Sequence, residues 1–256
     1  MEPIKDGDVD VSAAARLLAD PARARMLMVL ADGRAQPAGE LARAAGVTAA
    51  TASEHLAKLV AQGWLGAERY GRHRYYRIIA PDVVPALESL AVIAPITPVR
   101  SLRGARASRA MKIARTCYDH LAGAVGVAVF DSLCDGNALD MVGGEWQATT
   151  NPHPLLTELG IEPAQFKLTG RRPPVRACLD WSQRRYHLAG GLGSLVLQRM
   201  FDEKWCTSEK PNRAVVFTPA GWAALERVAD VDRAATESAA ESPAPDPRSL
   251  PTARGA

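Results

Sequence analysis

Two segments of this chain place a cysteine and a histidine close together. Cys117 precedes His120 by three positions, and Cys178 precedes His187 by a longer interval. Thiolate sulfur and imidazole nitrogen are the ligands that Zn(II) and related ions prefer, and a thiolate also reacts with oxidants and electrophiles. These residues are therefore tentative ligands for a metal ion or contacts for another effector. Because Cys117 and His120 are three positions apart, we expect them on one face of a helix.

A further interpretation assigns these residues no ligand. Buried cysteines pack as small apolar side chains, and histidines can hydrogen bond within a core. A tetrahedral site also requires the two segments to meet in space. Arg115 and Arg176 each lie two residues before a cysteine, where a cation could stabilise a thiolate. The metal, thiol-sensor and packing interpretations all stand at this point.

The cysteine segments are two copies of an internal repeat. Each copy reads Arg-x-Cys-x-Asp and, further on, His-Leu-Ala-Gly-x-x-Gly, starting at Arg115 and at Arg176. Each glycine lowers the stability of a helix by about 1 kcal/mol relative to alanine. The presence of several small residues in each copy therefore indicates tight packing or a ligand. The small residues expected on such helix faces are Ala122, Gly123, Gly126, Ala189, Gly190 and Gly193.

A second set of polar side chains lies on a stretch with helical periodicity. Between residues 48 and 62, Ala52, Leu56 and Leu59 recur at the spacing of a buried helix face. The polar residues expected to face outward and contact DNA are Thr48, Thr51, Ser53, His55 and Lys58. We expect Thr48 and Lys58 to bind phosphates and the other three to read bases, because phosphate contacts position a protein and base contacts specify the sequence.

Capping signals place this helix within a larger pattern. A helix is predicted over 13–19, and Asp20-Pro21 supplies a capping oxygen and a favoured first residue for a second helix over 22–31. A short helix over 40–45 is stopped by Gly46, and Thr48 caps the next helix, over 49–61. This order predicts a winged helix-turn-helix module.

The wing of that module is predicted to be a basic hairpin. Gly71 marks its tip, with flanking strands expected over 68–70 and 74–78. Arg72, His73 and Arg74 follow the tip and are expected to straddle a phosphate ridge or enter the adjacent minor groove. From Arg69 to Arg115 the chain has ten Lys or Arg and two acidic residues, a local net charge of +8 in a chain whose total is +3. This charge favours double-stranded DNA as the partner over a module that binds only proteins.

The segments LADPARARMLMVL, ELARAAGVTAATASEHLAKLVAQGWL and ERYGRHRYYRI resemble the ArsR type of bacterial winged-helix transcription regulators over about the first hundred residues. The resemblance implies a homodimer paired through the first helix and the helix after the wing (81–94), bound to a palindromic operator and released by an effector. The apolar residues tentatively expected at that interface are Leu17, Leu18, Val84, Leu87, Leu90 and Val92. The Cys-x-Cys of metal-sensing members is replaced here by Pro37, Ala38 and Gly39, so that thiolate site is absent.

The chain beyond the wing resembles long ArsR-like regulators with an extra C-terminal domain. After the second repeat copy we expect a helix, Trp205, a hairpin around 210–212, a strand over 214–217 and a helix capped by Thr218. This order predicts a degenerate winged-helix-like domain. The expected fold class is mainly α with small β-hairpins (α+β).

Length and composition fit a cytoplasmic protein with two domains, and the ArsR resemblance implies a bacterial regulator. The 256 residues, 47% of them hydrophobic, suffice for two modest cores, and no signal segment or membrane-spanning apolar run is found. The expected divisions are a DNA-binding and dimerisation domain over 1–97, an effector domain over 98–229 and a disordered tail over 230–256, which is rich in Pro, Ala and Ser.

Alternatives concern the C-terminal domain. Its cofactor or effector could be a metal ion or a small molecule, and the aromatic residues that could line an apolar pocket are Trp146, Trp181, Tyr186 and Trp205. An enzyme fused to a DNA-binding domain is disfavoured, because no Gly-x-Gly-x-x-Gly after a strand, Gly-x-Ser-x-Gly or His-Glu-x-x-His occurs. No catalytic residue is assigned. Basic residues recur at every third position from 103 to 115 (Arg103, Arg106, Arg109, Lys112 and Arg115) and form either a solvated face or a phosphate track.

Overall fold

The computed structural model describes residues 9–95, 101–162, 173–209 and 213–242. The chain divides into two compact units, residues 1–87 and 88–256. The division falls inside helix α5 (Val83–Ile93), earlier than the expected boundary at residue 97. No helix of the described residues is long and apolar enough to cross a membrane. The expected mixture of helices and small hairpins is confirmed in both units.

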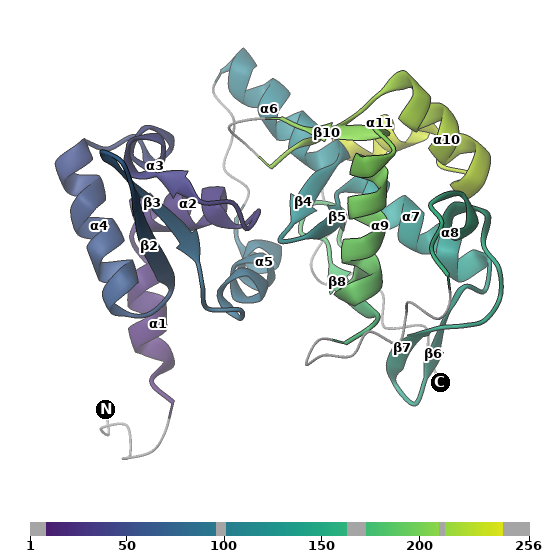
Figure 1. The fold of residues 1–256 in the computed structure, drawn as a ribbon, viewed down its shortest axis with the longest axis horizontal. Helices are drawn as coiled ribbons and strands as arrows, with labels where there is room; N and C mark the ends of the chain where they lie inside the picture. Colours follow the sequence, from purple (N-terminus) through teal and green to yellow (C-terminus); the bar gives the residue numbers. More distant parts are fainter. Residues whose placement is uncertain (1–8, 96–100, 163–172, 210–212, 243–256) are drawn as a thin grey trace. The chain divides into compact units, whose positions relative to one another are not determined.

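The first unit consists of four helices, a small sheet and the start of α5 (Figure 1). The helices are α1 (Val11–Leu18), α2 (Pro21–Leu30), α3 (Ala38–Ala45) and α4 (Ala49–Ala61). The antiparallel strands β1 (Gln36–Pro37), β3 (His73–Ile78) and β2 (Leu65–Tyr70) pair in that order. This is the predicted winged helix-turn-helix, with α4 as its recognition helix and β2 and β3 as its wing.

The predicted capping residues define these helices. Asp20 accepts hydrogen bonds from the backbone N–H groups of Ala22 and Arg23 at the start of α2. Gly46 ends α3 with φ +71°, a conformation that costs glycine little, and Thr48 accepts from the N–H of Thr51 to begin α4. The predicted inward residues of α4, Ala52, Leu56 and Leu59, are fully buried in the core of this unit.

The second unit is a tandem duplication of a hairpin, a helix, a second hairpin and a second helix (Figure 1). After α6 (Leu102–Ile113), the first copy contains β4 (Arg115–Cys117), β5 (His120–Ala122), α7 (Ala124–Asp135), β6 (Leu139–Val142), β7 (Glu145–Ala148) and α8 (Pro154–Glu158). The second contains β8 (Arg176–Leu179), β9 (Tyr186–Ala189), α9 (Gly190–Asp202), β10 (Cys206–Ser208), β11 (Val215–Phe217) and α10 (Pro219–Ala229). The expected elements after the second repeat are therefore present, and Thr218 caps α10 as predicted. The hairpin tip at 210–212 lies outside the described residues.

The two copies match in backbone detail. Gly123 and Gly190 form the strand-to-helix junctions with φ +83° and +82°, a region that other residues rarely adopt. Asn137 and Lys204 follow the two helices with φ +55° and +59°. The duplication thus extends well beyond the short repeat visible in the sequence.

Each long helix packs against the hairpin of the other copy. A Cβ atom added to Gly126 of α7 would lie 3.6 Å from the Cβ of His187 on β9, and one added to Gly193 of α9 would lie 3.2 Å from the Cβ of His120 on β5. The expected helix faces were partly wrong, because Ala122 and Ala189 end strands β5 and β9. The need for small residues is explained by this reciprocal close packing.

The expectation of a disordered tail from residue 230 is wrong for its first part. Helix α11 (Arg233–Glu241) is capped by Asp232 and buries Thr236 and Ala240. It packs against α6, where Arg109 binds Glu237 and Glu241. Residues 243–256 lie outside the described residues.

Candidate DNA interface and Cys/His centre

Three of the DNA contacts predicted for α4 and its cap are exposed. Ser53 and Lys58 are exposed, and Thr48 is exposed at the start of the helix. Thr51 is half-buried, and its hydroxyl lies 2.9 Å from that of Thr48. Hydroxyl and ammonium groups on one helix face can bind base edges and phosphates.

His55 departs from the expected outward orientation. Its side chain is only 13% exposed, and its Nε2 lies 3.8 Å from Asp20 Oδ1. Its Nδ1 lies 3.3 Å from Nη1 of Arg23. His55 therefore links α4 to the start of α2, and its side chain does not face outward to read bases as expected. Sequence periodicity could not distinguish these positions, because the surface that covers His55 belongs to another helix.

The wing tip and α4 enclose a concave surface within the first unit. Gly71 turns the hairpin with φ +58°, and Arg72, His73 and Arg74 are all exposed. These three residues and Ser53 line a cavity of about 540 Å³. Three basic or titratable side chains facing a cavity beside the recognition helix suit a nucleic-acid phosphate.

Two arginines of the basic run after the wing are paired with carboxylates. Arg115 is fully buried and its Nη2 lies 2.9 Å from Asp180 Oδ2. Arg109 binds Glu237 and Glu241 at 3.1 and 2.8 Å. These cations are neutralised within the second unit, so the local charge count overstated what DNA could meet.

The residues expected to form a dimer interface differ in exposure. Leu87 is buried in the core of the first unit, so its assignment to the interface is wrong. Val84 and Val92 are also buried, and Leu17 and Leu18 are half-buried. Leu90 is 44% exposed and remains available to a partner.

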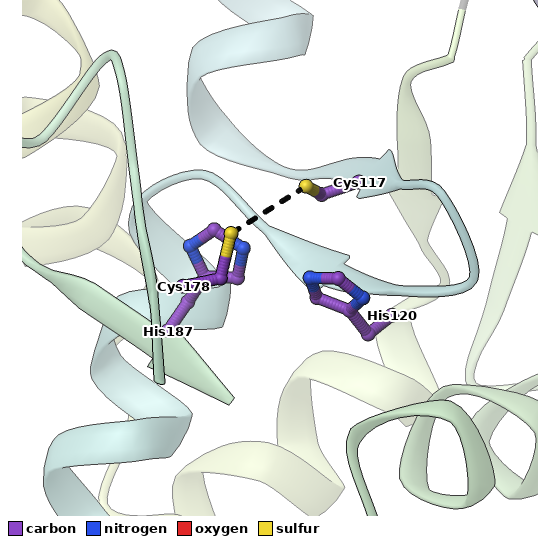
Figure 2. Close-up of side chains that lie close together, drawn as sticks. All are labelled: Cys117, His120, Cys178 and His187. Carbon is purple, nitrogen blue, oxygen red and sulfur yellow. Dashed lines mark hydrogen bonds between the residues drawn. The ribbon is translucent and has the colours of Figure 1, made fainter. Parts of the chain in front are cut away.

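The four cysteine and histidine residues of the repeat meet in the second unit (Figure 2). Their potential ligand atoms all lie within 4.8 Å of one another. The expected helix location is wrong, because both pairs lie on hairpins: Cys117 is the cross-strand partner of His120, and Cys178 of His187. Each hairpin therefore contributes one sulfur and one imidazole to the same cluster.

The cluster is closely packed. The two sulfur atoms are 3.9 Å apart, and the imidazole rings lie roughly parallel with centroids 5.1 Å apart. Cys117, His120 and His187 are buried, and Cys178 is half-buried. The Nε2 atoms of both histidines are buried and have no hydrogen-bond partner among the described residues. Such unpaired buried polar atoms are costly unless a ligand satisfies them.

A carboxylate lies beside each imidazole. Nδ1 of His120 is 3.3 Å from Asp119 Oδ1, and Nδ1 of His187 is 3.5 Å from Asp180 Oδ2. A carboxylate at one ring nitrogen orients the imidazole and directs the other nitrogen toward a ligand. Both aspartates belong to the Arg-x-Cys-x-Asp repeat, so the sequence contained a signal for them that the search for ligands alone overlooked.

Asp180 also connects the two copies. Its Oδ2 accepts hydrogen bonds from Nη2 of Arg115 at 2.9 Å and from the N–H of Gly123 at 2.7 Å. Its Oδ1 accepts from the N–H and hydroxyl of Ser182 at 2.8 and 2.6 Å. Burial opposes ionisation, but Arg115 and His187 hold the pKa of Asp180 well below its usual range. Asp180 is thus a buried anion in a dense network.

The cysteine and histidine groups of this centre differ in their affinity for protons. Contact with Cys178 and burial raise the pKa of Cys117 to about 12, whereas contact with Cys117 lowers that of Cys178 against the effect of burial. Burial disfavours the imidazolium of His120, but Cys117 and Asp119 raise its pKa to about 9. Among the nearby arginines, Arg176 lowers the pKa of Cys178, while Arg115 is held by Asp180.

The other candidate features of this unit are accounted for by packing. Trp205 is in the core, and Trp146 and Tyr186 pack against it. The guanidinium of Arg115 lies over the ring of Trp181, with its Cζ 4.5 Å from the ring centroid. Burial raises the pKa of Cys206 to about 12. These contacts favour a packing role for the aromatic residues over the alternative of an apolar pocket.

Known proteins are similar to this chain in sequence. The family described as "Helix-turn-helix domain" matches residues 18–63, which include α2, α3 and α4. The HTH-type transcriptional regulator YdfF of Bacillus subtilis (strain 168) is 40% identical over 218 residues, which are 85% of this chain and 96% of YdfF.

Two solved structures are similar to a smaller part of the chain. The AntR antimony-specific transcriptional repressor is 33% identical, with 35% of this chain and 88% of that chain covered and a TM-score of 0.29. The homodimeric winged helix-turn-helix DNA-binding domain of Mb0332 from Mycobacterium bovis is 31% identical, with 35% and 89% covered and a TM-score of 0.29.

Proposed function

The chain belongs to the helix-turn-helix transcriptional regulators, and we propose that it is an ArsR-type repressor that binds a palindromic operator as a homodimer and responds to an effector in its second unit. The observation that carries this proposal is the exposed polar face of α4 beside a basic wing. The second unit then acts as a regulatory domain of a cytoplasmic protein, without a catalytic role.

The proposed DNA contacts are those that the first unit exposes. Ser53 and Thr51 would meet base edges, and Lys58 and Thr48 would bind flanking phosphates. The wing residues Arg72, His73 and Arg74 would bind the backbone beside them. His55 would act by holding α4 against α2.

A homodimer is proposed because a single recognition helix reads only a few base pairs, whereas a palindrome presents two equivalent half-sites. Leu90 on α5 is an exposed apolar residue suited to such a contact. Leu90→Glu should shift the protein in sedimentation experiments toward the 27.4 kDa mass of one chain. Wild-type protein that sediments as a monomer at micromolar concentration would contradict the dimer.

The effector is proposed to act at the Cys/His centre, where four reactive or ligating side chains converge. A second candidate mechanism is thiol sensing, which is favoured by the 3.9 Å separation of the two sulfurs. An oxidant could close this pair into a disulfide, with loss of both thiol protons and two electrons to the oxidant. Cys117→Ser with Cys178→Ser should then abolish release of DNA by oxidants.

Binding to DNA upstream of the protein's own coding sequence tests the proposal. Fluorescence anisotropy with tiled duplexes should identify one fragment bound far more tightly than random DNA at equal salt. Lys58→Ala should weaken all duplexes about equally, whereas Ser53→Ala should also change the preference among them. Arg227→Ala, which removes an exposed cation of the second unit, serves as the matched control. If every fragment binds like random DNA, the proposed function fails.

A further inference from the structure

We propose that the second unit binds one Zn(II)-class ion between its two copies, through Sγ of Cys117 and Cys178 and Nε2 of His120 and His187 (Figure 2). This inference rests on the proposed function in that it names the ligand class of the Cys/His centre, but the site lies wholly within the second unit, so metal binding can be measured without DNA.

The separation of the sulfurs suits a shared metal ion. Zn–S bonds of about 2.3 Å at a tetrahedral angle place two sulfurs about 3.8 Å apart. The observed separation is 3.9 Å, far from the length of about 2.0 Å in a disulfide. The widest ligand separation is 4.8 Å, so the imidazoles need to close by about 1 Å to complete the tetrahedron.

One imidazole is held by a carboxylate and the other lies near one. Nδ1 of His120 is within hydrogen-bond distance of Asp119, whereas Nδ1 of His187 lies 3.5 Å from Asp180 and has no hydrogen bond among the described residues. The Nε2 atoms of both rings are buried and have no hydrogen-bond partner among the residues described. An ion would satisfy both Nε2 atoms at once and, at His120, would complete a carboxylate–histidine–metal arrangement with Asp119.

Charge and ligand type select the class of ion. The two negative charges of the thiolates would neutralise the two positive charges of a divalent ion, and the two imidazoles would bind in their neutral form. The buried centre would then carry no net charge. Sulfur and nitrogen ligands disfavour Mg(II) and Ca(II), which prefer oxygen. Four protein ligands leave no open position for water, which is typical of a structural or regulatory site and not of a catalytic one.

The duplication explains how the ligands converge. Each copy supplies one cysteine and one histidine as cross-strand partners. Gly126 and Gly193 allow the backbone of each helix to approach the histidine of the other copy. The ion would therefore join the two copies, and its loss should loosen the contact between them.

Cobalt titration of the full chain tests this inference. The protein is reduced, stripped of metal with a chelator and titrated with Co(II) under anaerobic conditions. We expect one Co(II) per chain, with the visible bands of tetrahedral cobalt and a thiolate charge-transfer band, and displacement of both by one equivalent of Zn(II). Cys178→Ser should weaken binding at least tenfold and diminish the charge-transfer band. Cys134→Ser, which removes another half-buried thiol, is the matched control and should bind like the wild type.

A second variant protects the test against misfolding. Asp119 is 30% exposed, so Asp119→Asn should fold, keep the charge-transfer band and bind Co(II) about 10- to 100-fold more weakly. Absence of stoichiometric Co(II) binding, or equal binding by Cys178→Ser and wild type, would overturn the inference. A disulfide between Cys117 and Cys178 in oxidised protein that takes up no metal when reduced would also overturn it. Operator binding is measured separately, so loss of DNA binding with intact cobalt binding would contradict only the proposed function.

Discussion

The wing offers a sharp test of DNA binding, through the double variant Arg72→Ala with Arg74→Ala. Arg72 and Arg74 are exposed after the turn at Gly71. Nε of Arg72 donates to Nε2 of His73 at 3.3 Å, and the guanidinium of Arg74 lies 5.5 Å from the ring centroid of Tyr76. Within the described ranges neither forms an ion pair with a carboxylate, so both charges are available to phosphates.

The expected magnitude follows from counterion release. Each phosphate neutralised by a cation contributes about 0.9 to the slope of log affinity against log salt. Two cations per protomer contribute about 1.8, and a dimer contributes about 3.6. Raising the salt from about 50 to 200 mM lowers the operator affinity of both proteins. The fold loss should be roughly 100 times smaller for the double variant than for the wild type.

The assay is anisotropy of a labelled operator duplex at a series of salt concentrations. The free energy of unfolding should change by less than about 0.5 kcal/mol, because the substitutions are exposed. Arg185→Ala with Arg227→Ala is the matched control, since it removes two exposed cations that pair with Asp131 and Glu158 in the second unit. An unchanged slope in the wing variant, or an equal change in the control, would refute the assignment of the wing.

Three further predictions concern stability, measured by urea unfolding of reduced, metal-free protein. Asp180→Asn should cost about 3–5 kcal/mol, because it leaves Arg115 as a fully buried cation without its anion; a loss under 1 kcal/mol would contradict this. Gly126→Ala and Gly193→Ala should each lower the free energy of unfolding by about 1–3 kcal/mol, because either new Cβ would lie 2.6 Å from a backbone oxygen. A neutral result for only one of the two variants would argue that the copies are not equivalent. Asp20→Ala should cost about 1 kcal/mol through loss of the α2 cap. The hydrogen bond from the N–H of Arg23 lowers the pKa of Asp20 from its usual value of 3.8. The loss of stability caused by Asp20→Ala should therefore be complete at neutral pH and shrink as the pH falls below about 4. A loss that does not depend on pH would contradict the role of the charge.

The first unit was predictable because its signals are local. Asp20, Gly46 and Thr48 act on backbone groups within a few residues, and the spacing of Leu56 and Leu59 reports the buried face of a single helix. His55 was misplaced because its environment comes from α2, which no pattern within α4 encodes. The same reason explains Leu87, which is buried by residues distant in sequence.

In the second unit, local signals misled where pairing between strands decides the structure. The three-residue spacing of Cys117 and His120 suits a helix and a tight hairpin equally well, and the positive φ of Tyr118 selects the hairpin. Helix α11 has no apolar residue larger than alanine, yet it packs against α6 and α7 and buries Thr236 and Ala240. Propensity alone could not show that these small residues meet a partner surface.

The amino-acid sequence by itself determined the chemical types at the centre and the existence of two copies, because residue identity and repetition are properties of the chain. Tertiary structure alone decided that the copies pack reciprocally and bring four ligand atoms within 4.8 Å. It also decided that Asp180 binds Arg115 and lies 3.5 Å from Nδ1 of His187. The four ligands converge because α7 and α9 each pack against the hairpin of the other copy. These contacts join segments far apart in sequence, so their free energy cannot be inferred from any short stretch of residues.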